Sequence, residues 1–197
     1  MRGMGVGLYG GSFSPVHEGH AHVAETARRR LGLHRVIWLV SPQNPLKSRV
    51  QTQPLGQRLA QVRAFARGQG MIASDIEARL DTRFTLDTLL ALKARFPGVR
   101  FVWIMGADGL ASLHHWRGWR QIMRTLPVAV VSRPPSSLKS RFSPAARRFG
   151  SARLAAQRAP GLSGQEPPAW IFLHGPLHFQ SSTALREAAA AESIRHG

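Results

Sequence analysis

Two histidines stand three residues apart in the stretch GGSFSPVHEGH, between a short apolar run and a segment with helical periodicity. Once a helix begins there, His17 and His20 share one face near its positively polarised N-terminus. Imidazole donors at that position can stabilise a phosphorus centre that gains negative charge during transfer, without a covalent enzyme intermediate. A zinc-protease motif would need histidines four residues apart, so the spacing favours a phosphate site.

The glycines before the histidines support this interpretation. Gly10 and Gly11 end the apolar run, and their missing side chains would let a ligand phosphate approach the backbone N–H groups. Gly19 leaves room for a nucleotide against the start of the helix. The alternative is a glycine turn followed by two surface histidines.

A second candidate anion site lies near the far end of the chain, in QSSTALRE. Ser181, Ser182 and Thr183 would open a last helix, with Arg186 one turn further on. Hydroxyl groups, unpaired N–H groups and a guanidinium together suit phosphate oxygens. The alternative is an ordinary Ser/Thr N-cap followed by a surface arginine.

The elements that must position these residues follow an alternating pattern, which is typical of βαβ units around a parallel sheet. The apolar runs are VGLYG, RVIWLVS, GMIASDIE, VRFVWIMG, LPVAVVSR and AWIFLHG, and helical spacing covers His20 to Leu31, Leu55 to Gln69, Thr85 to Phe96 and Trp116 to Leu126. The pattern predicts an α/β fold, a Rossmann-like doubly wound parallel sheet of five or six strands with helices on both faces.

Ligands bind such sheets at the carboxyl ends of the strands, so the loops after the strands are expected to carry the chemistry. These loops are GGSFSPVHEGH, SPQNPLKSR, MGADGL, SRPP and HFQSSTALRE. Residues 134–168 are rich in Pro, Ser, Gly, Ala and Arg and interrupt the pattern, with one short helix expected over Ser143 to Gln157. We expect a single domain over residues 1–197.

Composition limits the function classes. The chain of 197 residues contains no cysteine, which excludes disulfides and thiolate metal sites. No signal sequence or membrane-length apolar run is apparent, so we expect a cytoplasmic protein. The net charge of +17 suggests an anionic partner. A phosphorylated small molecule fits, whereas no nucleic acid is expected because no basic recognition helix or RNP-like strand is present.

The two candidate sites carry a resemblance to a known superfamily. GGSFSPVHEGH resembles the GGxFDPxHxGH signature of the nucleotidyltransferases, which couple a nucleoside triphosphate to a nucleophilic partner with loss of pyrophosphate. QSSTALRE resembles the ISSTxxR motif of the same proteins. Ser14 stands where aspartate is commoner, and Gln180 replaces an isoleucine.

Three further stretches resemble the nicotinate-nucleotide adenylyltransferase branch. SPQNPLKSR is similar to its PxxNPxK element, which implies that Asn44 and Lys47 meet substrate phosphates. TRFTLDTLLAL is similar to (S/T)YTxDTL, which implies that the Thr85 backbone meets the nicotinate carboxylate, and Phe84 replaces the usual tyrosine. In SLHHWRGWRQI the resemblance implies that Trp116 stacks on the pyridine ring, whereas Trp119 is expected in the core.

The resemblance implies transfer of the adenylyl group of ATP to nicotinate mononucleotide, with Mg²⁺ held by the phosphates and not directly by the protein. MGADGL resembles the element that holds the ATP ribose, which makes Asp108 a ribose or metal-water partner, with a helix N-cap as the alternative. Residues implied in catalysis are His17, His20, Lys47 and Arg186. Those implied in ATP binding are Gly10, Gly11, Ser12, Phe13, His17, His20, Gly106, Asp108, Arg133, Ser181, Ser182, Thr183 and Arg186, and those implied in acceptor binding are Asn44, Lys47, Thr85 and Trp116.

Two alternatives stay open at this point. A relative with another acceptor, such as nicotinamide mononucleotide, phosphopantetheine or glycerol phosphate, would carry the same catalytic motifs. A basic nucleic-acid-binding protein on a Rossmann-like scaffold is the alternative from another class. The expected partners are ATP and nicotinate mononucleotide, and the sequence leaves a homo-oligomer open.

Overall fold

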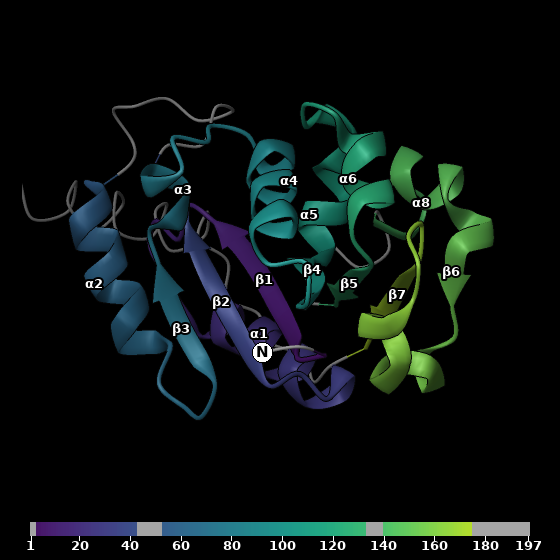
Figure 1. The fold of residues 1–197 in the computed structure, drawn as a ribbon, viewed down its shortest axis with the longest axis horizontal. Coiled ribbons are helices and arrows are strands. Elements are labelled where there is room, and N and C mark those ends of the chain that lie inside the picture. The colour runs from purple at the N-terminus through teal and green to yellow at the C-terminus, as the bar shows by residue number, and fades with distance from the viewer. Residues whose placement is uncertain (1–2, 43–52, 133–139, 175–197) are drawn as a thin grey trace, which may run out of the picture.

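The computed structural model describes residues 3–42, 53–132 and 140–174, and its centre is one sheet (Figure 1). Seven strands lie in the order β3-β2-β1-β4-β5-β7-β6, and every adjacent pair is parallel. The strands are β1 (Gly5–Gly11), β2 (Arg35–Val40), β3 (Met71–Ser74), β4 (Arg100–Gly106), β5 (Val128–Val131), β6 (Arg153–Leu154) and β7 (Trp170–Leu173). This arrangement confirms the predicted Rossmann-like α/β fold.

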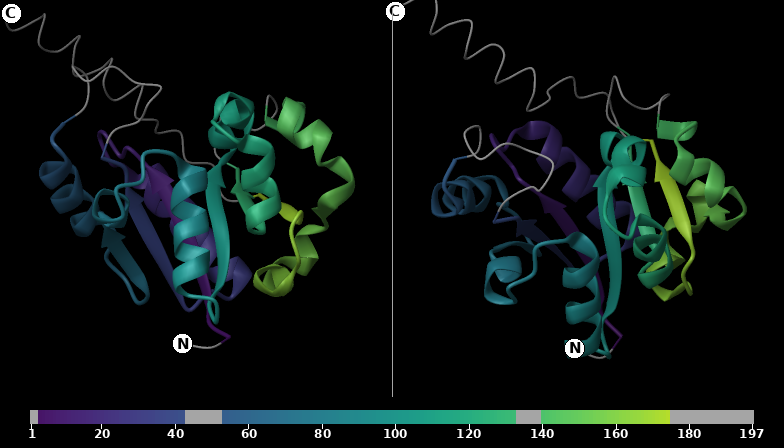
Figure 2. Two further views of the ribbon diagram at one scale, coloured as in Figure 1. Left: turned by 45° about the horizontal axis from the view of Figure 1, so that its top comes forward. Right: turned by 90° about the horizontal axis from the view of Figure 1, so that it is seen from above.

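Helices cover both faces of the sheet (Figure 2). The α-helices are α1 (Glu18–Leu31), α2 (Leu55–Phe65), α3 (Ile76–Arg79), α4 (Thr85–Arg95), α5 (Ala107–Ser112), α6 (Trp119–Thr125) and α8 (Pro144–Arg148), and the 3₁₀ helices are η2 (Leu113–His115), η3 (Gly150–Ala152) and η4 (Ala156–Gly164). One core cluster contains apolar residues of α1, α2 and η4, and the other contains those of α4, α5, α6 and α8. The sheet is therefore buried on both sides.

The strand sequences explain this burial. All residues of β5 and β7 are buried, and so are all of β4 except its first residue. Near-continuous apolar runs of this kind are expected where both faces of a parallel sheet are covered. Trp38 of β2 and Trp103 of β4 belong to opposite core clusters and are each only 1% exposed.

Strand β1 lies at the point where the strand order reverses. It pairs with β2 on one side and with β4 on the other. A crevice at the carboxyl ends of the strands is the usual ligand site at such a switch point. The loop after β1, which leads to the two histidines, therefore begins where a nucleotide is expected.

The structure corrects several expected boundaries. The run GMIASDIE is a strand only to Ser74, because the chain turns at Asp75 into α3. Helix α2 ends at Phe65 rather than Gln69, ahead of two glycines with positive φ, and α6 starts after Gly118, which also has positive φ. Two further helical elements, α5 and η2, precede α6 where a loop was expected.

The segment expected to hold one short helix is also more structured. Ser143 caps α8 by accepting a hydrogen bond from the Ala146 amide at 3.2 Å, but the helix ends at Arg148. The two-residue strand β6 and the 3₁₀ helix η4 follow it. In the described part of the chain the sheet therefore has seven strands rather than the five or six expected.

Gly10 provides a test of how tightly this core is packed. A Cβ atom on Gly10 would lie 2.3 Å from Cη2 of the buried Trp103 ring. We expect Gly10→Ala to lower the free energy of unfolding by about 1–3 kcal/mol, because overpacking forces neighbours off their preferred positions. Urea unfolding measures this change.

Gly56→Ala in α2 is the matched control for Gly10→Ala. A Cβ atom there would meet nothing within 4 Å, so removing a helical glycine should stabilise the protein by roughly 0.5–1 kcal/mol. A Gly10→Ala variant as stable as the wild type would show that the Trp103 ring can move aside.

No helix in the described ranges has the length and apolar character to span a membrane.

Candidate active site

His17 and His20 form the N-terminal cap of α1. His17 is the N-cap residue, and its Nδ1 accepts a hydrogen bond from the Gly19 amide at 3.1 Å. The Nδ1 atom of His20 accepts one from the His17 amide at 3.3 Å. Each imidazole therefore satisfies an amide that the helix itself leaves without a partner.

This capping geometry selects one tautomer for each ring. A nitrogen that accepts an N–H bond cannot carry a proton itself, so in the neutral imidazole the proton must lie on Nε2. Both histidines are thereby arranged to donate through Nε2. Capping and donation to a ligand use opposite sides of each ring, so one residue can do both.

The rings of the two histidines are packed together and largely withdrawn from water. Their centroids are 3.9 Å apart, and the side chains of His17 and His20 are both buried. The Phe13 ring contacts His20 edge to face at 5.1 Å. A hydrogen bond donated from such a water-poor site to developing charge is stronger than it would be in bulk water.

Phe13 holds an unusual backbone conformation in the loop before these histidines. Its φ is +45°, in the left-handed region that bulky side chains rarely adopt. The ring packs against Tyr9 and Trp38, with centroids 5.4 Å and 5.3 Å away. Surrounding contacts must hold this conformation, and such residues are often found at functional sites.

The structure gives Gly10 and Gly11 a packing reason that the sequence did not reveal. The space of a side chain is filled by the Trp103 ring at Gly10 and by the Phe13 ring at Gly11, where a Cβ atom would lie 3.0 Å from Phe13 Cζ. Contact of their backbone with a phosphate stays a prediction.

The end of β4 lies beside the end of β1. Gly106 is the N-cap of α5, so Asp108 lies in the first turn of that helix and is not the N-cap residue considered above. Its side chain is exposed to solvent. Because β4 pairs with β1, the helix that carries Asp108 and the loop that leads to the two histidines start from neighbouring strands.

Two sequence motifs assigned to the acceptor lie side by side. Thr85 is the first residue of α4, and the N-cap residue Phe84 offers its first amides no side-chain hydrogen bond. A Cβ atom on Gly118, which follows Trp116 by two residues, would lie 2.5 Å from Leu86 Cδ2. The start of α4 is therefore in contact with the chain directly before α6.

Arg117 adds a cation at this contact. Its guanidinium lies 4.5 Å from the Phe84 ring centroid and its Nη1 lies 3.7 Å from Asp87 Oδ2. Trp116 and Trp119 are both partly buried against the core cluster below them. Trp119, which was expected in the core, is thus only partly buried, and packing also accounts for part of the Trp116 surface.

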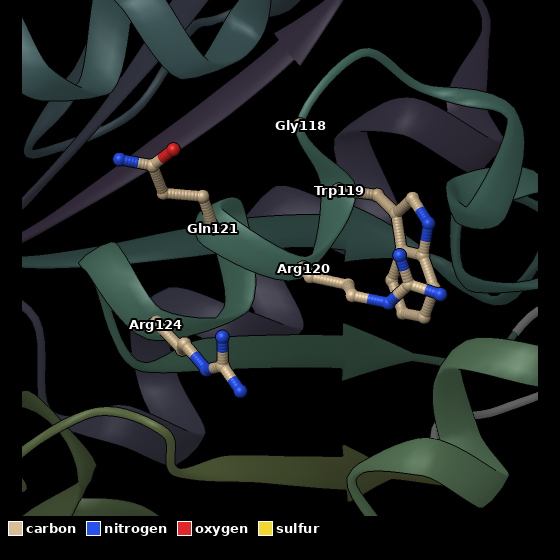
Figure 3. A pocket seen from close by; sticks show the side chains of 5 residues that line it. All are labelled: Gly118, Trp119, Arg120, Gln121 and Arg124. Atoms are coloured by element: carbon tan, nitrogen blue, oxygen red, sulfur yellow. The ribbon is translucent and has the colours of Figure 1, made fainter.

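A basic pocket adjoins this region (Figure 3). It has a volume of about 370 Å³ and is lined by Gly118, Trp119, Arg120, Gln121 and Arg124. The Arg120 guanidinium lies over the Trp119 ring, 4.8 Å from its centroid. The guanidinium groups of Arg120 and Arg124 make this pocket electropositive.

The remaining predicted site residues lie outside the described part of the chain. They are Asn44, Lys47, Arg133, Ser181, Ser182, Thr183 and Arg186. Ser12 is described and lies in the loop directly after β1.

Comparison with known proteins places this geometry in a family. The sequence profile of the Cytidylyltransferase-like family matches residues 8–188. A Caulobacter protein (strain K31) named "Probable nicotinate-nucleotide adenylyltransferase" is 64% identical over 183 residues, which is 93% of this chain and 97% of that protein. A Cereibacter sphaeroides protein (strain ATCC 17025) of the same name is 55% identical over 93% of this chain and 97% of its own length.

The chain belongs to the nicotinate-nucleotide adenylyltransferase family. Solved structures agree on the fold of such an adenylyltransferase. Nicotinic acid mononucleotide adenylyltransferase of Plasmodium falciparum, complexed with NaAD, superposes with a TM-score of 0.68 at 17% identity, covering 93% of this chain and 83% of that one. A structure from Vibrio parahaemolyticus gives 0.56 at 19% identity, covering 68% and 77%.

One residue near this adenylyltransferase site escaped the sequence analysis. Arg58 of α2 is 0% exposed, and its guanidinium donates to backbone carbonyls at the ends of β1 and β2. Its position was a usable signal, since Leu55, Arg58, Leu59 and Val62 follow the spacing of one buried helix face. Burial lowers the pKa of the Arg58 guanidinium from its usual value.

Glu77 is a second buried charged residue at the same end of the sheet. Burial raises the pKa of its carboxyl above the ordinary value of 4.5, and a hydrogen bond with Ser41 acts in the opposite direction. The folded protein therefore holds this proton more tightly than the unfolded chain. Stability should fall as the pH rises from about 4.5 through the folded-state pKa.

We expect Glu77→Gln to remove this decrease of stability with rising pH. The difference in melting temperature, variant minus wild type, should be larger at pH 7.5 than at pH 4.5. Each kcal/mol of unfolding free energy corresponds to about 2–4 °C. Thermal unfolding at both pH values measures the difference. Glu166→Gln, which removes an exposed carboxylate, is the control. The same relative melting temperature at both pH values would contradict a tightly held proton.

Proposed function

We propose that this chain transfers the adenylyl group of ATP to nicotinate mononucleotide, giving deamido-NAD and pyrophosphate. One observation supports this proposal for a chain of this family. Two adjacent, buried imidazoles lie at the start of α1, and the Nδ1 atom of each accepts a hydrogen bond from a backbone amide. In the neutral imidazole these contacts place the proton on Nε2, which makes Nε2–H the donor of each ring. The same residues form the HxGH element by which the sequence resembles the superfamily.

The reaction is a direct displacement at phosphorus. An oxygen of the mononucleotide phosphate forms a bond to the α-phosphorus of ATP, while the bond from that phosphorus to the bridging oxygen breaks and pyrophosphate leaves. Negative charge develops on the oxygens around the α-phosphorus and on the leaving group. Donation from His17 and His20 to these oxygens would lower the barrier, because the donors are already oriented when the substrates bind.

The acceptor side rests on Thr85, Trp116 and the cations near them. A flat aromatic face can stack on a pyridine ring, and the first amides of α4 can donate to a carboxylate. Asn44 and Lys47 are proposed for the acceptor phosphate. Arg133, Arg186 and the serine and threonine hydroxyls of residues 181–183 are proposed for the triphosphate.

ATP enters such reactions with a divalent cation on its phosphates, and we propose Mg²⁺ for this role. The described residues include no group of three or more His, Cys, Asp or Glu side chains that could hold a metal ion. Asp108, an oxygen donor, fits a place beside the waters of a phosphate-bound ion. Because the reaction consumes ATP, we also propose a cytoplasmic location.

A coupled assay of pyrophosphate release tests the proposal. The purified protein is supplied with ATP, Mg²⁺ and one acceptor at a time: nicotinate mononucleotide, nicotinamide mononucleotide, phosphopantetheine or glycerol phosphate. We expect release with nicotinate mononucleotide and a matching yield of deamido-NAD by chromatography. Release that requires a different acceptor would keep adenylyl transfer and replace the substrate. No release with any acceptor would overturn the proposed activity.

A further inference from the structure

Arg58 makes an unusual set of contacts for a buried charge. Within the described residues its guanidinium donates four hydrogen bonds, and all of them go to backbone carbonyls: Nε to Gln53 at 2.7 Å, Nη1 to Ser12 at 2.8 Å and to Ser41 at 2.7 Å, and Nη2 to Pro42 at 2.9 Å. None of the ion pairs found within residues 3–42, 53–132 and 140–174 involves Arg58. The charge is therefore stabilised by carbonyl dipoles alone in the described structure.

These carbonyls come from three separate segments. Ser12 lies directly after β1, Ser41 and Pro42 lie directly after β2, and Gln53 lies just before α2. The ends of β1 and β2 are already neighbours, since the Ser41 amide donates to the Gly11 carbonyl at 3.1 Å. Arg58 therefore connects the segments that follow β1 and β2 to helix α2.

The bond to Ser12 acts on a conformation that needs support. The Ser12 carbonyl belongs to the peptide that precedes Phe13, so fixing that carbonyl fixes one of the two planes that define φ of Phe13. That φ is +45°, and the Phe13 ring packs against His20 at 5.1 Å. A short chain of contacts thus leads from Arg58 through Phe13 to the imidazole.

We propose that Arg58 is a positioning residue for adenylyl transfer, which holds the chain after β1 and after β2 in one relative arrangement. The inference rests on the proposed function, because its consequence is the placing of His20 against the triphosphate. An arginine suits the task because its planar fork reaches four carbonyls at once, whereas a lysine ammonium has three donors at one point.

Arg58→Lys tests the inference while keeping the positive charge. We expect kcat/KM to fall roughly 10- to 30-fold per folded molecule, with higher KM values for both substrates, because small misplacements of reacting groups are costly. Arg63→Lys, on the exposed side of the same helix, is the matched control and should behave as wild type.

Hydrogen exchange provides a readout that does not depend on activity. In Arg58→Lys, peptides that cover residues 11–16 and 39–42 should exchange faster, while peptides from β4 and β5 keep their protection. Arg58→Ala adds a second measurement: millimolar guanidinium should restore several-fold activity to it and none to Arg63→Ala.

The outcomes separate the two hypotheses. If the wild type and Arg63→Lys form no dinucleotide, the proposed function fails, and the exchange pattern still decides whether Arg58 orders the two strand ends. If the wild type is active and Arg58→Lys keeps more than half of kcat/KM with unchanged exchange, the positioning role is overturned. Faster exchange through the whole sheet would also overturn it, because Arg58 would then support only global stability.

Discussion

Replacing His20 by asparagine is expected to lower kcat about 10²- to 10³-fold while leaving the fold intact, the usual effect of losing one preoriented transition-state donor. The side chain of His20 has two separable functions in this structure. Nδ1 accepts from the His17 amide at 3.3 Å, and in that tautomer Nε2 carries the proton and can donate. An alanine would remove both functions and would leave a cap amide unsatisfied.

Asparagine and glutamine divide those functions between them. The amide oxygen of asparagine can occupy the place of Nδ1 and keep the cap, but no donor then reaches the place of Nε2. Glutamine extends far enough to put an N–H group near the Nε2 position, at the expense of the cap. We therefore expect His20→Asn to be stable and slow, and His20→Gln to be less stable and faster than His20→Asn.

Thermal melts and steady-state kinetics at saturating substrates distinguish these effects. The loss of an N-cap hydrogen bond costs about 0.5–2 kcal/mol, which a melt detects. Should His20→Asn retain more than about a third of the wild-type turnover, donation from Nε2 would not be part of the chemistry. The imidazole would then be a cap only.

The sequence predicted the fold and the helix start that carries His17 and His20 because both depend on local patterns. Apolar runs of buried strands and the periodic faces of α1 and α4 predicted the sheet and its covering helices. The HxGH spacing predicted a helix start, and His17 indeed caps α1. The sequence could not show that capping selects the tautomer, because that follows from the direction of two backbone amides.

Contacts between distant segments were beyond such patterns. Arg58 donates a hydrogen bond to the Ser12 carbonyl across 46 positions. Helical spacing could have marked Arg58 as buried, but nothing in the local sequence shows which carbonyls it meets. The sequence analysis related the missing side chain of Gly10 to phosphate approach, and it did not show that the Trp103 ring, which is far away in sequence, fills the space beside Gly10. Asp87 was likewise overlooked as a neighbour of Arg117.

Asp87 matters for the choice of acceptor. The sequence between Gly109 and Gln165 has no acidic residue, which favours a carboxylate ligand near Trp116. The structure adds one carboxylate from α4 at this place, but Arg117 lies 3.7 Å from it and counters its charge. Arg120 and Arg124 line the adjoining pocket, so cations still outnumber acids there.

We therefore expect kcat/KM for nicotinate mononucleotide to exceed that for nicotinamide mononucleotide roughly 10- to 150-fold, which is equivalent to about 1.5–3 kcal/mol. The first amides of α4 and the nearby guanidiniums can donate to a carboxylate, whereas an amide NH₂ would face donors. Stacking on Trp116 would serve both rings alike and would add affinity without selectivity. Side-by-side kinetics with the two mononucleotides, at fixed ATP and Mg²⁺, measure the ratio.

Asp87→Asn sharpens the test of acceptor choice. It removes the one acidic group found at the contact between α4 and Arg117, so the preference for the carboxylate should rise further. Asp81→Asn removes an exposed acid before α4 and, because asparagine tolerates the positive φ of that position, serves as the matched control. Equal kcat/KM for both mononucleotides in the wild type, or a preference for the amide, would overturn the acceptor assignment. The proposal of adenylyl transfer would stand in either case, since the role proposed for His17 and His20 concerns the phosphates and not the ring.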